Sequence, residues 1–315
     1  MRAARIAAPE TVEIADVPTP DPGPGQVLVQ IEGCGVCGSD VPVWQGRPWF
    51  DYPRDAGAPG HEGWGRVAAL GEGANGVAVG DRVAAMAFAS DAEYDVADAN
   101  AVVRLQDELD GKPFPGEALG CTINVARRSD LRGGSTVAVV GAGFLGALLV
   151  QIASRAGARV IAISRRPYAR EVASTMGADE VLPLDDDALA RVDELTDGEL
   201  CDRVLEVTGK QEPLDLAAKL TRVRGRLVIA GFHQDGPRQV DMQMWNWRGL
   251  DVINAHERDP AVYVRGMREA AEAVASGRLD PSPLYTHEFP LDRIGEAFAT
   301  ASERPEGFLK AVVRP

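Results

Sequence analysis

A glycine-rich turn between an apolar strand and a helix constrains the fold of this chain most. The run Thr136–Val140 is apolar and β-branched, and Phe144–Ala156 has the length and apolar content of a helix. In such a turn the first glycine permits a sharp bend, the second lets the backbone approach a pyrophosphate, and the third allows close packing of helix on strand. The sequence therefore predicts a dinucleotide-binding turn made by Gly141, Gly143, Phe144, Leu145 and Gly146.

Strands and helices alternate after this turn. A helix is expected at Ala169–Met176, and apolar strands are expected at Arg159–Ser164, Glu180–Leu184, Arg203–Val207, Arg226–Ala230 and Leu250–Asn254. Such alternation is typical of a parallel sheet with helices on its faces. The pattern predicts an α/β unit of the Rossmann type, a doubly wound parallel sheet.

The residues after the second strand bear on the choice of cofactor. Enzymes that use NAD place an Asp or Glu there, against the ribose diol. This chain has Ser164, Arg165 and Arg166 instead, and guanidinium groups are suited to a 2′-phosphate. We predict that NADP(H) is preferred over NAD(H), although both arginines can also be read as solvated residues at a helix start.

The first third of the chain has a different pattern. Short apolar runs at Gln26–Ile31, Gly65–Leu70 and Asp81–Ala85 are separated by glycine and proline. This spacing predicts a mostly antiparallel β domain. A helix at Val262–Ser276 and a strand at Leu309–Val313 are expected near the C-terminus.

Composition narrows the class of protein. A length of 315 residues suits two domains, and a formal net charge of −14 argues against a nucleic-acid or anionic-membrane partner. The four cysteines show no disulfide-scaffold spacing, which favours a reducing compartment. Glu10 and Glu13 interrupt the N-terminal stretch, so no secretory signal is expected there. Val137–Ala153 is a poor membrane span because it holds three glycines and Gln151. The expectation is a cytoplasmic enzyme.

Two segments carry residues that suit a metal. Gly33–Asp40 reads Gly-Cys-Gly-Val-Cys-Gly-Ser-Asp, and Pro59–Gly65 reads Pro-Gly-His-Glu-Gly-Trp-Gly. Cysteine and neutral histidine bind zinc, and a catalytic zinc uses three protein ligands and one open position. From spacing alone, a zinc or redox pair of Cys34 and Cys37 stays open, as does an ordinary core role for these residues. A structural zinc would need a second pair, which Cys121 and Cys201 do not form.

Four motifs occur in order along the chain. They are Gly-x-Cys-Gly-Ser-Asp, Gly-His-Glu-x-x-Gly, Gly80-Asp-Arg-Val83 and Gly-x-Gly-x-x-Gly. In the order and rough spacing of these motifs, the chain resembles the zinc-dependent medium-chain dehydrogenase/reductase superfamily. Within it, the chain is similar to the branch of sorbitol and threonine dehydrogenases. The resemblance covers almost the whole length of the chain. The resemblance implies a mainly β, GroES-like catalytic domain at residues 1–122 and 262–315. It places the Rossmann domain at residues 123–261.

The resemblance also implies the roles of single residues. Cys37 and His61 are expected to bind one catalytic zinc, with Glu62 either on the metal or just behind it. Glu117 stands where this branch carries a glutamate near zinc, and Cys121 competes with it because related alcohol dehydrogenases use a cysteine as third ligand. Ser39 resembles the hydroxyl that contacts the substrate oxygen. The expected catalytic residues are therefore Cys37, Ser39, His61 and Glu62.

The chain departs from this family pattern in two places. The family commonly carries a cysteine-rich lobe with a structural zinc, but Ala84–Gly116 contains no cysteine. We therefore predict no structural zinc. A relay histidine often follows the metal cysteine by five residues, and Pro42 stands there instead. Proton release must then use water or another group.

The expected reaction is hydride transfer between NADP(H) and a secondary alcohol or ketone, assisted by zinc as a Lewis acid. The loop that holds Trp44, Gln45, Arg47 and Trp49 follows the cysteine motif. These side chains suit a polyol, sugar or cyclitol, but they can equally be ordinary core and surface residues. A homo-oligomer, dimer or tetramer, is expected. The rival functions are a zinc-independent NADPH quinone or enoyl reductase and a non-catalytic NADPH-binding protein.

Overall fold

The computed structural model describes residues 1–315, and the chain divides into two units. The first unit contains Met1–Cys121 and Arg258–Pro315, and the second contains Thr122–Glu257. Helix α2 (Gly116–Ser129) begins in the first unit and ends in the second. No helix of either unit combines the length and the apolar character needed to cross a bilayer.

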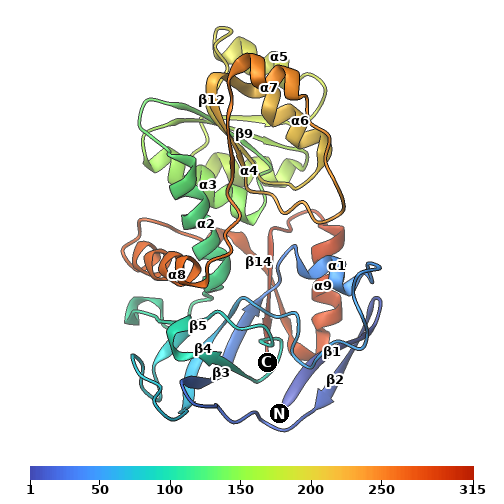
Figure 1. Ribbon diagram of the computed structural model, residues 1–315, viewed down its shortest axis with the longest axis vertical. Helices are drawn as coiled ribbons and strands as arrows, with labels where there is room; N and C mark the ends of the chain where they lie inside the picture. Colours follow the sequence, from blue (N-terminus) through green and yellow to red (C-terminus); the bar gives the residue numbers. More distant parts are fainter. The chain divides into compact units, whose positions relative to one another are not determined.

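A mixed sheet forms the centre of the first unit (Figure 1). Its strand order is β14-β15-β3-β4-β5-β7, with β6 also paired to β3, and only β14 and β15 run parallel. The glycines and prolines between the strands allow the short turns that antiparallel neighbours need. The strands are β3 (Gln26–Gly35), β4 (Gly63–Leu70), β5 (Arg82–Ala85), β6 (Tyr94–Asp98), β7 (Val102–Arg104), β14 (Tyr285–Pro290) and β15 (Lys310–Arg314).

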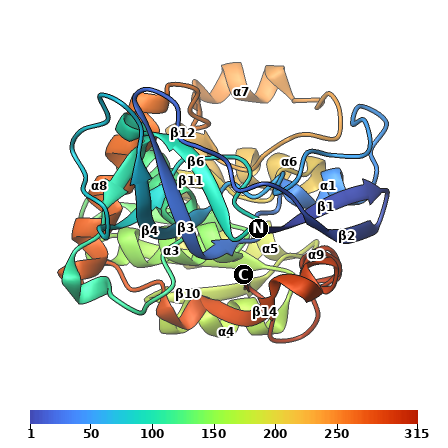
Figure 2. The ribbon, with the colours of Figure 1, turned by 90° about the horizontal axis from the view of Figure 1, so that it is seen from below.

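An N-terminal hairpin and two helices build one core of this unit. The hairpin pairs β1 (Arg2–Ala8) with β2 (Thr11–Asp16), and it packs beside α9 (Ile294–Glu303), as Figure 2 shows. Buried Ile6, Val41 and Phe298 belong to one apolar cluster, which also includes residues of α1 (Asp40–Trp44). This cluster holds α1 and α9 in fixed positions next to each other.

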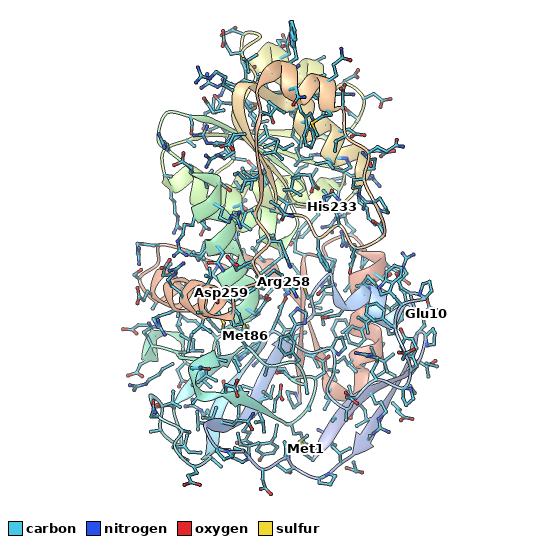
Figure 3. The ribbon with its side chains drawn as sticks, viewed as in Figure 1. Met1, Glu10, Met86, His233, Arg258 and Asp259 are labelled. Atoms are coloured by element: carbon cyan, nitrogen blue, oxygen red, sulfur yellow. The ribbon has the colours of Figure 1, made fainter.

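Helix α8 (Pro260–Ala275) also belongs to the first unit, and its first residues explain where it begins. The side chain of Asp259, labelled in Figure 3, accepts a hydrogen bond from the Ala261 amide at 2.9 Å. Pro260 occupies the first helical position, where its missing N–H leaves no intrahelical bond unmade. The cap explains why the helix begins here rather than at Val262.

The second unit is a six-stranded parallel sheet in the order β10-β9-β8-β11-β12-β13. This confirms the predicted doubly wound α/β fold. The strands are β8 (Thr136–Val140), β9 (Arg159–Ser164), β10 (Glu180–Pro183), β11 (Cys201–Glu206), β12 (Thr221–Ile229) and β13 (Asp251–Asn254). The helices are α3 (Phe144–Arg155), α4 (Pro167–Thr175), α5 (Ala188–Leu195), α6 (Gln211–Leu220) and α7 (Met242–Arg248).

Alternation along β8 places helices on both faces of this sheet. Ala138 and Val140 lie in one buried cluster with residues of α5 and α6. Val139 points the other way, toward α3, where its side chain lies against Gly146. Successive side chains of a strand face opposite sides, so an entirely apolar strand of this kind is buried on both.

Candidate functional site

Two loops of the first unit bring the expected metal ligands together. Cys37 lies between β3 and α1, and His61 and Glu62 lie just before β4. The strands are antiparallel neighbours, and the pairing of Cys34 with Gly63 sets the two loops side by side. The ligand atoms of Cys37, His61 and Glu62 all lie within 4.8 Å of one another. One thiol, one imidazole and one carboxylate at this spacing are a donor set that suits zinc.

Buried Asp40 orients both loops. One carboxylate oxygen accepts a hydrogen bond from the Cys37 amide at 2.8 Å, and the other lies 3.2 Å from Nδ1 of His61. Nδ1 also lies 2.9 Å from the Pro59 carbonyl, so this nitrogen is the donor and Nε2 is left for a metal. Burial disfavours the imidazolium, but the contacts with Asp40 and Cys37 outweigh it and raise the pKa of His61 well above its usual value.

Glu62 is held by a buried lysine. Its two carboxylate oxygens lie 2.7 and 2.5 Å from Nζ of Lys310, the first residue of β15, and both residues are almost fully buried. Burial would lower the pKa of Lys310, but Glu62 outweighs it and raises that pKa. Gly35 makes room for the carboxylate, since a β-carbon there would lie 2.0 Å from the second Glu62 oxygen. The negative charge of Glu62 is therefore balanced within the protein.

Glu117 and Cys121 lie one turn apart on α2. The Cys121 thiol donates to a Glu117 carboxylate oxygen at 3.1 Å. Burial raises the pKa of Glu117, and burial together with Glu117 raises that of Cys121 well above its usual value. Glu117 has no cation in ion-pair contact, unlike Glu62. It is a half-buried acid whose ionised form is favoured, apart from the Cys121 thiol, only by the more distant charges of His61 and Lys310.

Cys34 does not share the metal centre with Cys37. It is almost fully buried in β3, its thiol donates weakly to the Gly35 carbonyl, and burial raises its pKa well above the usual range. The negative charge of buried Asp91 contributes to this rise, and burial raises the pKa of Asp91 itself. This geometry removes the alternative of a single Cys-x-x-Cys site.

The other residues predicted for the substrate region lie at the N-cap of α1, within this helix or after it. Ser39 precedes the helix and is partly exposed, and Pro42 is buried within it. Trp44 packs against the core cluster of Ile6 and Phe298, whereas Trp49 is 55% exposed and its ring lies tilted against Phe50. Trp44 is therefore mainly a packing residue, and Trp49 is the aromatic side chain open to a ligand.

The glycine turn of the second unit has the geometry that its sequence predicts. Gly141 has φ 107°, and a β-carbon there would lie 2.6 Å from Thr208. A β-carbon on Gly146 would lie 1.9 Å from the Gly141 carbonyl oxygen. Nothing lies within 4 Å of the corresponding point at Gly143, which is the N-cap of α3. This open space beside the N-cap of α3 leaves room for an anion at the helix start, where the helix dipole favours one.

The segment after β9 carries three arginines. Ser164 is buried at the strand end, Arg165 is exposed, and Arg166 is the N-cap of α4. Arg170, which the sequence analysis did not select, donates to the Ser164 and Arg165 carbonyls at 3.0 and 2.9 Å. It holds the backbone that presents the other two guanidinium groups.

A buried network shapes the turn after β11 and was also missed. Glu206 is fully buried and accepts hydrogen bonds from the Thr208 and Gly209 amides at 2.6 and 2.9 Å. Its other oxygen lies 2.9 Å from Nε2 of His233, whose Nδ1 accepts from Arg238 at 2.8 Å. The partners therefore assign a structural role to His233, which is labelled in Figure 3.

These features define a class: a two-unit oxidoreductase with a Rossmann dinucleotide turn and a Cys–His–carboxylate centre. The family model described as zinc-binding dehydrogenase matches residues 145–273, and the alcohol dehydrogenase GroES-like domain matches residues 23–140. The chain belongs to the zinc-type medium-chain dehydrogenases, as its motifs predict. It is a dehydrogenase of the alcohol dehydrogenase type.

Several relatives and solved structures resemble the chain along nearly its whole length. The 2-dehydro-3-deoxy-L-galactonate 5-dehydrogenase of Pseudoalteromonas atlantica is 28% identical, covering 93% of this chain and 92% of the relative. Sorbitol dehydrogenase of Gallus gallus is 29% identical, covering 92% and 90%. A structure from Sinorhizobium meliloti, described as a zinc-binding dehydrogenase bound to NADP, has a TM-score of 0.86 and 25% identity, covering 100% and 99%.

Proposed function

We propose that the chain is a zinc-dependent dehydrogenase that transfers a hydride between NADP(H) and a secondary alcohol or ketone of the polyol or sugar class. The observation that carries this proposal is the convergence of Cys37, His61 and Glu62 within 4.8 Å, with Asp40 fixing the imidazole. A histidine that only packs in a core does not require a carboxylate that orients its ring next to a half-buried thiol. A histidine that binds a metal does, because its second nitrogen must be held by a hydrogen-bond partner.

The residues divide the work as follows. Cys37 and His61 hold the metal, and Glu117 is the third ligand because no cation is in ion-pair contact with it, whereas Glu62 is paired with Lys310. Lys310 keeps Glu62 beside the metal without leaving its charge uncompensated. When bound, zinc supplies Lewis-acid stabilisation of negative charge on the substrate oxygen. Ser39 accepts the substrate proton and passes it to water, since Pro42 has no titratable group.

The third ligand can be tested on α2. We expect Glu117→Ala to weaken zinc binding by roughly 100-fold or more, because even supporting groups of a metal site contribute 10- to 100-fold. Cys121→Ala should change zinc affinity much less, since its raised pKa keeps the thiol protonated as a donor to Glu117. Competition titration with a zinc chelator measures both variants. A larger loss in Cys121→Ala would instead assign the thiol as the ligand.

The cofactor preference depends on the arginines after β9. In Arg165→Ala/Arg166→Ala we expect NADPH affinity to fall by about 10- to 100-fold, because charged hydrogen bonds contribute about 1.5–3 kcal/mol each. NADH has no 2′-phosphate, so its affinity should change by no more than about threefold. Fluorescence titration of both cofactors compares the losses. Equal losses would contradict the assignment of these arginines to the 2′-phosphate.

The substrate class rests on two supports. Relatives named for sorbitol and for 2-dehydro-3-deoxy-L-galactonate point to polyols and sugar acids. Exposed Trp49 offers an aromatic face to a carbohydrate. Metal analysis and a substrate screen with NADP⁺ and NAD⁺ test the whole proposal. About one zinc per chain, with no second structural zinc, is expected. A metal-free enzyme insensitive to chelators would favour the zinc-independent reductase.

A further inference from the structure

Arg304 lies against the metal-binding loop. It ends α9, and its Nη2 lies 3.9 Å from the point that a β-carbon on Gly38 would occupy. Apart from the neighbours of Gly38 along the chain, no other group lies within 4 Å of that point. Gly38 is exposed and separates Cys37 from Ser39. The guanidinium therefore borders an open space directly beside a predicted metal ligand and the predicted substrate-binding hydroxyl.

This guanidinium has no acidic partner. Several other arginines of the first unit pair with carboxylates; Arg66 and Arg82, for example, lie 3.0 and 2.6 Å from Glu32. Arg304 makes only a long hydrogen bond of 3.4 Å to the Ala301 carbonyl. Although the residue is exposed as a whole, desolvation of its guanidinium lowers the pKa of Arg304, and no carboxylate offsets it. A partly desolvated cation without an anion is a place where a ligand can supply one.

The backbone at Arg304 adds a second argument. Its φ of 50° and ψ of 61° are left-handed, and glycine is the residue that most easily adopts this conformation at a helix end. The position is nevertheless well fixed. Its amide donates to Thr300 at 2.8 Å, and Gln45 donates to Ser302 at 2.9 Å, which ties α1 to α9. An arginine kept where glycine would relax the backbone points to a use for its side chain.

We propose that Arg304 and the open space over Gly38 form an anion subsite that holds an anionic oxygen of a ligand bound at the metal centre. This inference rests on the proposed function, since the metal positions that ligand. The anionic oxygen belongs to a carboxylate of the substrate, because the metal centre of the first unit positions the substrate. A substrate carboxylate would narrow the substrate class from neutral polyols to hydroxy acids derived from sugars.

The negative charge of the metal centre explains why an anionic ligand would need a cation there. Asp40, Glu62 and Glu117 all belong to the metal centre, and the chain carries a net charge of −14. Like charges in a poorly solvated site repel strongly, so an acidic ligand needs a local cation to enter. Lys310 is already paired with Glu62. Arg304 is the cation at this loop that is left for a ligand.

The test compares ligands that differ in one group. D-gluconate and D-sorbitol share a carbon chain, but gluconate ends in a carboxylate where sorbitol ends in a hydroxymethyl group. Calorimetry on the zinc-loaded enzyme would measure gluconate, sorbitol and NADP⁺ with wild type, Arg304→Met and Arg304→Lys. Exposed Arg278, which donates a hydrogen bond to Ser276 in the same unit, supplies the matched control Arg278→Met.

Because the proposed anion is a substrate carboxylate, Arg304→Met should weaken gluconate about tenfold or more, the usual effect of a charged hydrogen bond. Sorbitol should change by no more than about twofold, and Arg304→Lys should keep part of the affinity. A loss confined to NADP⁺ would contradict the subsite, because the proposed anion belongs to the ligand at the metal centre. Unchanged affinity of Arg304→Met for gluconate would overturn it. Zinc content of the wild type tests the proposed function separately.

A second variant separates binding from folding. Because glycine suits the left-handed backbone, Arg304→Gly should unfold at the same temperature as wild type or a higher one. It should still lose affinity for the anion as Arg304→Met does. A fall in unfolding temperature with no loss of anion binding would show that Arg304 only supports the fold.

Discussion

Cys37→Ser is expected to lose both bound zinc and dehydrogenase activity, the latter by on the order of 10³-fold. A Lewis acid contributes several kcal/mol to stabilising the charge that develops on the reacting oxygen, and each 1.36 kcal/mol is a factor of ten in rate. Serine is a weak zinc ligand at neutral pH because its hydroxyl keeps its proton, whereas a cysteine gives up its proton to the metal. Elemental analysis of the purified variant and initial rates with NADP⁺ would measure the two losses.

Cys34 provides the matched control. It lies three residues away, is almost fully buried, and takes no part in the group formed by Cys37, His61 and Glu62. We expect Cys34→Ala to keep its zinc and most of its activity, with only the modest loss of stability that a small core cavity causes. Zinc loss from Cys34→Ala equal to that from Cys37→Ser would mean that the two cysteines share a metal after all.

Local sequence patterns predicted the dinucleotide half of the molecule well. The turn at Gly141–Gly146 and the strand Arg159–Ser164 depend on neighbouring residues, and the structure has β9 with the predicted bounds. In such a turn the same few glycines determine both the backbone conformation and the ability to bind a pyrophosphate. Because the prediction used only the local pattern, it placed the start of β12 at Arg226, whereas the strand begins at Thr221. Its first residues are polar and lack the apolar pattern of a buried strand.

Elements stabilised by distant parts of the chain were missed. The hairpin strand Arg2–Ala8 is rich in alanine, which favours strands little, and it forms through pairing with β2 and packing on α9. Helix α2 contains Gly120, which weakens a helix. That glycine is needed because a β-carbon there would lie 2.8 Å from the Met267 amide of α8. Neither requirement can be seen in the local sequence.

The residues of the candidate site also divide into those that local sequence predicts and those that only tertiary contacts bring into place. Cys37, His61 and Glu62 stand in motifs whose spacing carries the chemistry, so the sequence could select them. Asp40 stood in the same motif, but its contact with His61 depends on a fold that joins two loops. Lys310 comes from a strand 248 residues after Glu62, and no pattern around it signals a buried ion pair. Supporting residues are set by tertiary structure, and they were the ones missed.

That buried pair gives the largest expected change in stability. Lys310→Met should lower the free energy of unfolding by about 3–5 kcal/mol, because it leaves the buried Glu62 carboxylate without a compensating charge. Methionine keeps most of the apolar length of the lysine stem, so lost packing contributes little. Urea unfolding of the zinc-free variant and wild type, followed by circular dichroism, measures the difference without a contribution from metal binding.

The double variant Lys310→Met/Glu62→Met shows whether charge is the cause. Replacing both partners of a buried ion pair by apolar groups of similar size is often neutral or stabilising, whereas removing one partner is not. The double variant should therefore recover most of the stability that Lys310→Met loses, although it also loses Glu62 from the metal centre. If it is as unstable as the sum of the two single changes, the two side chains do not interact as a pair. In that case Lys310 would support the sheet through packing, and Glu62 would be free of the restraint that keeps it beside the metal.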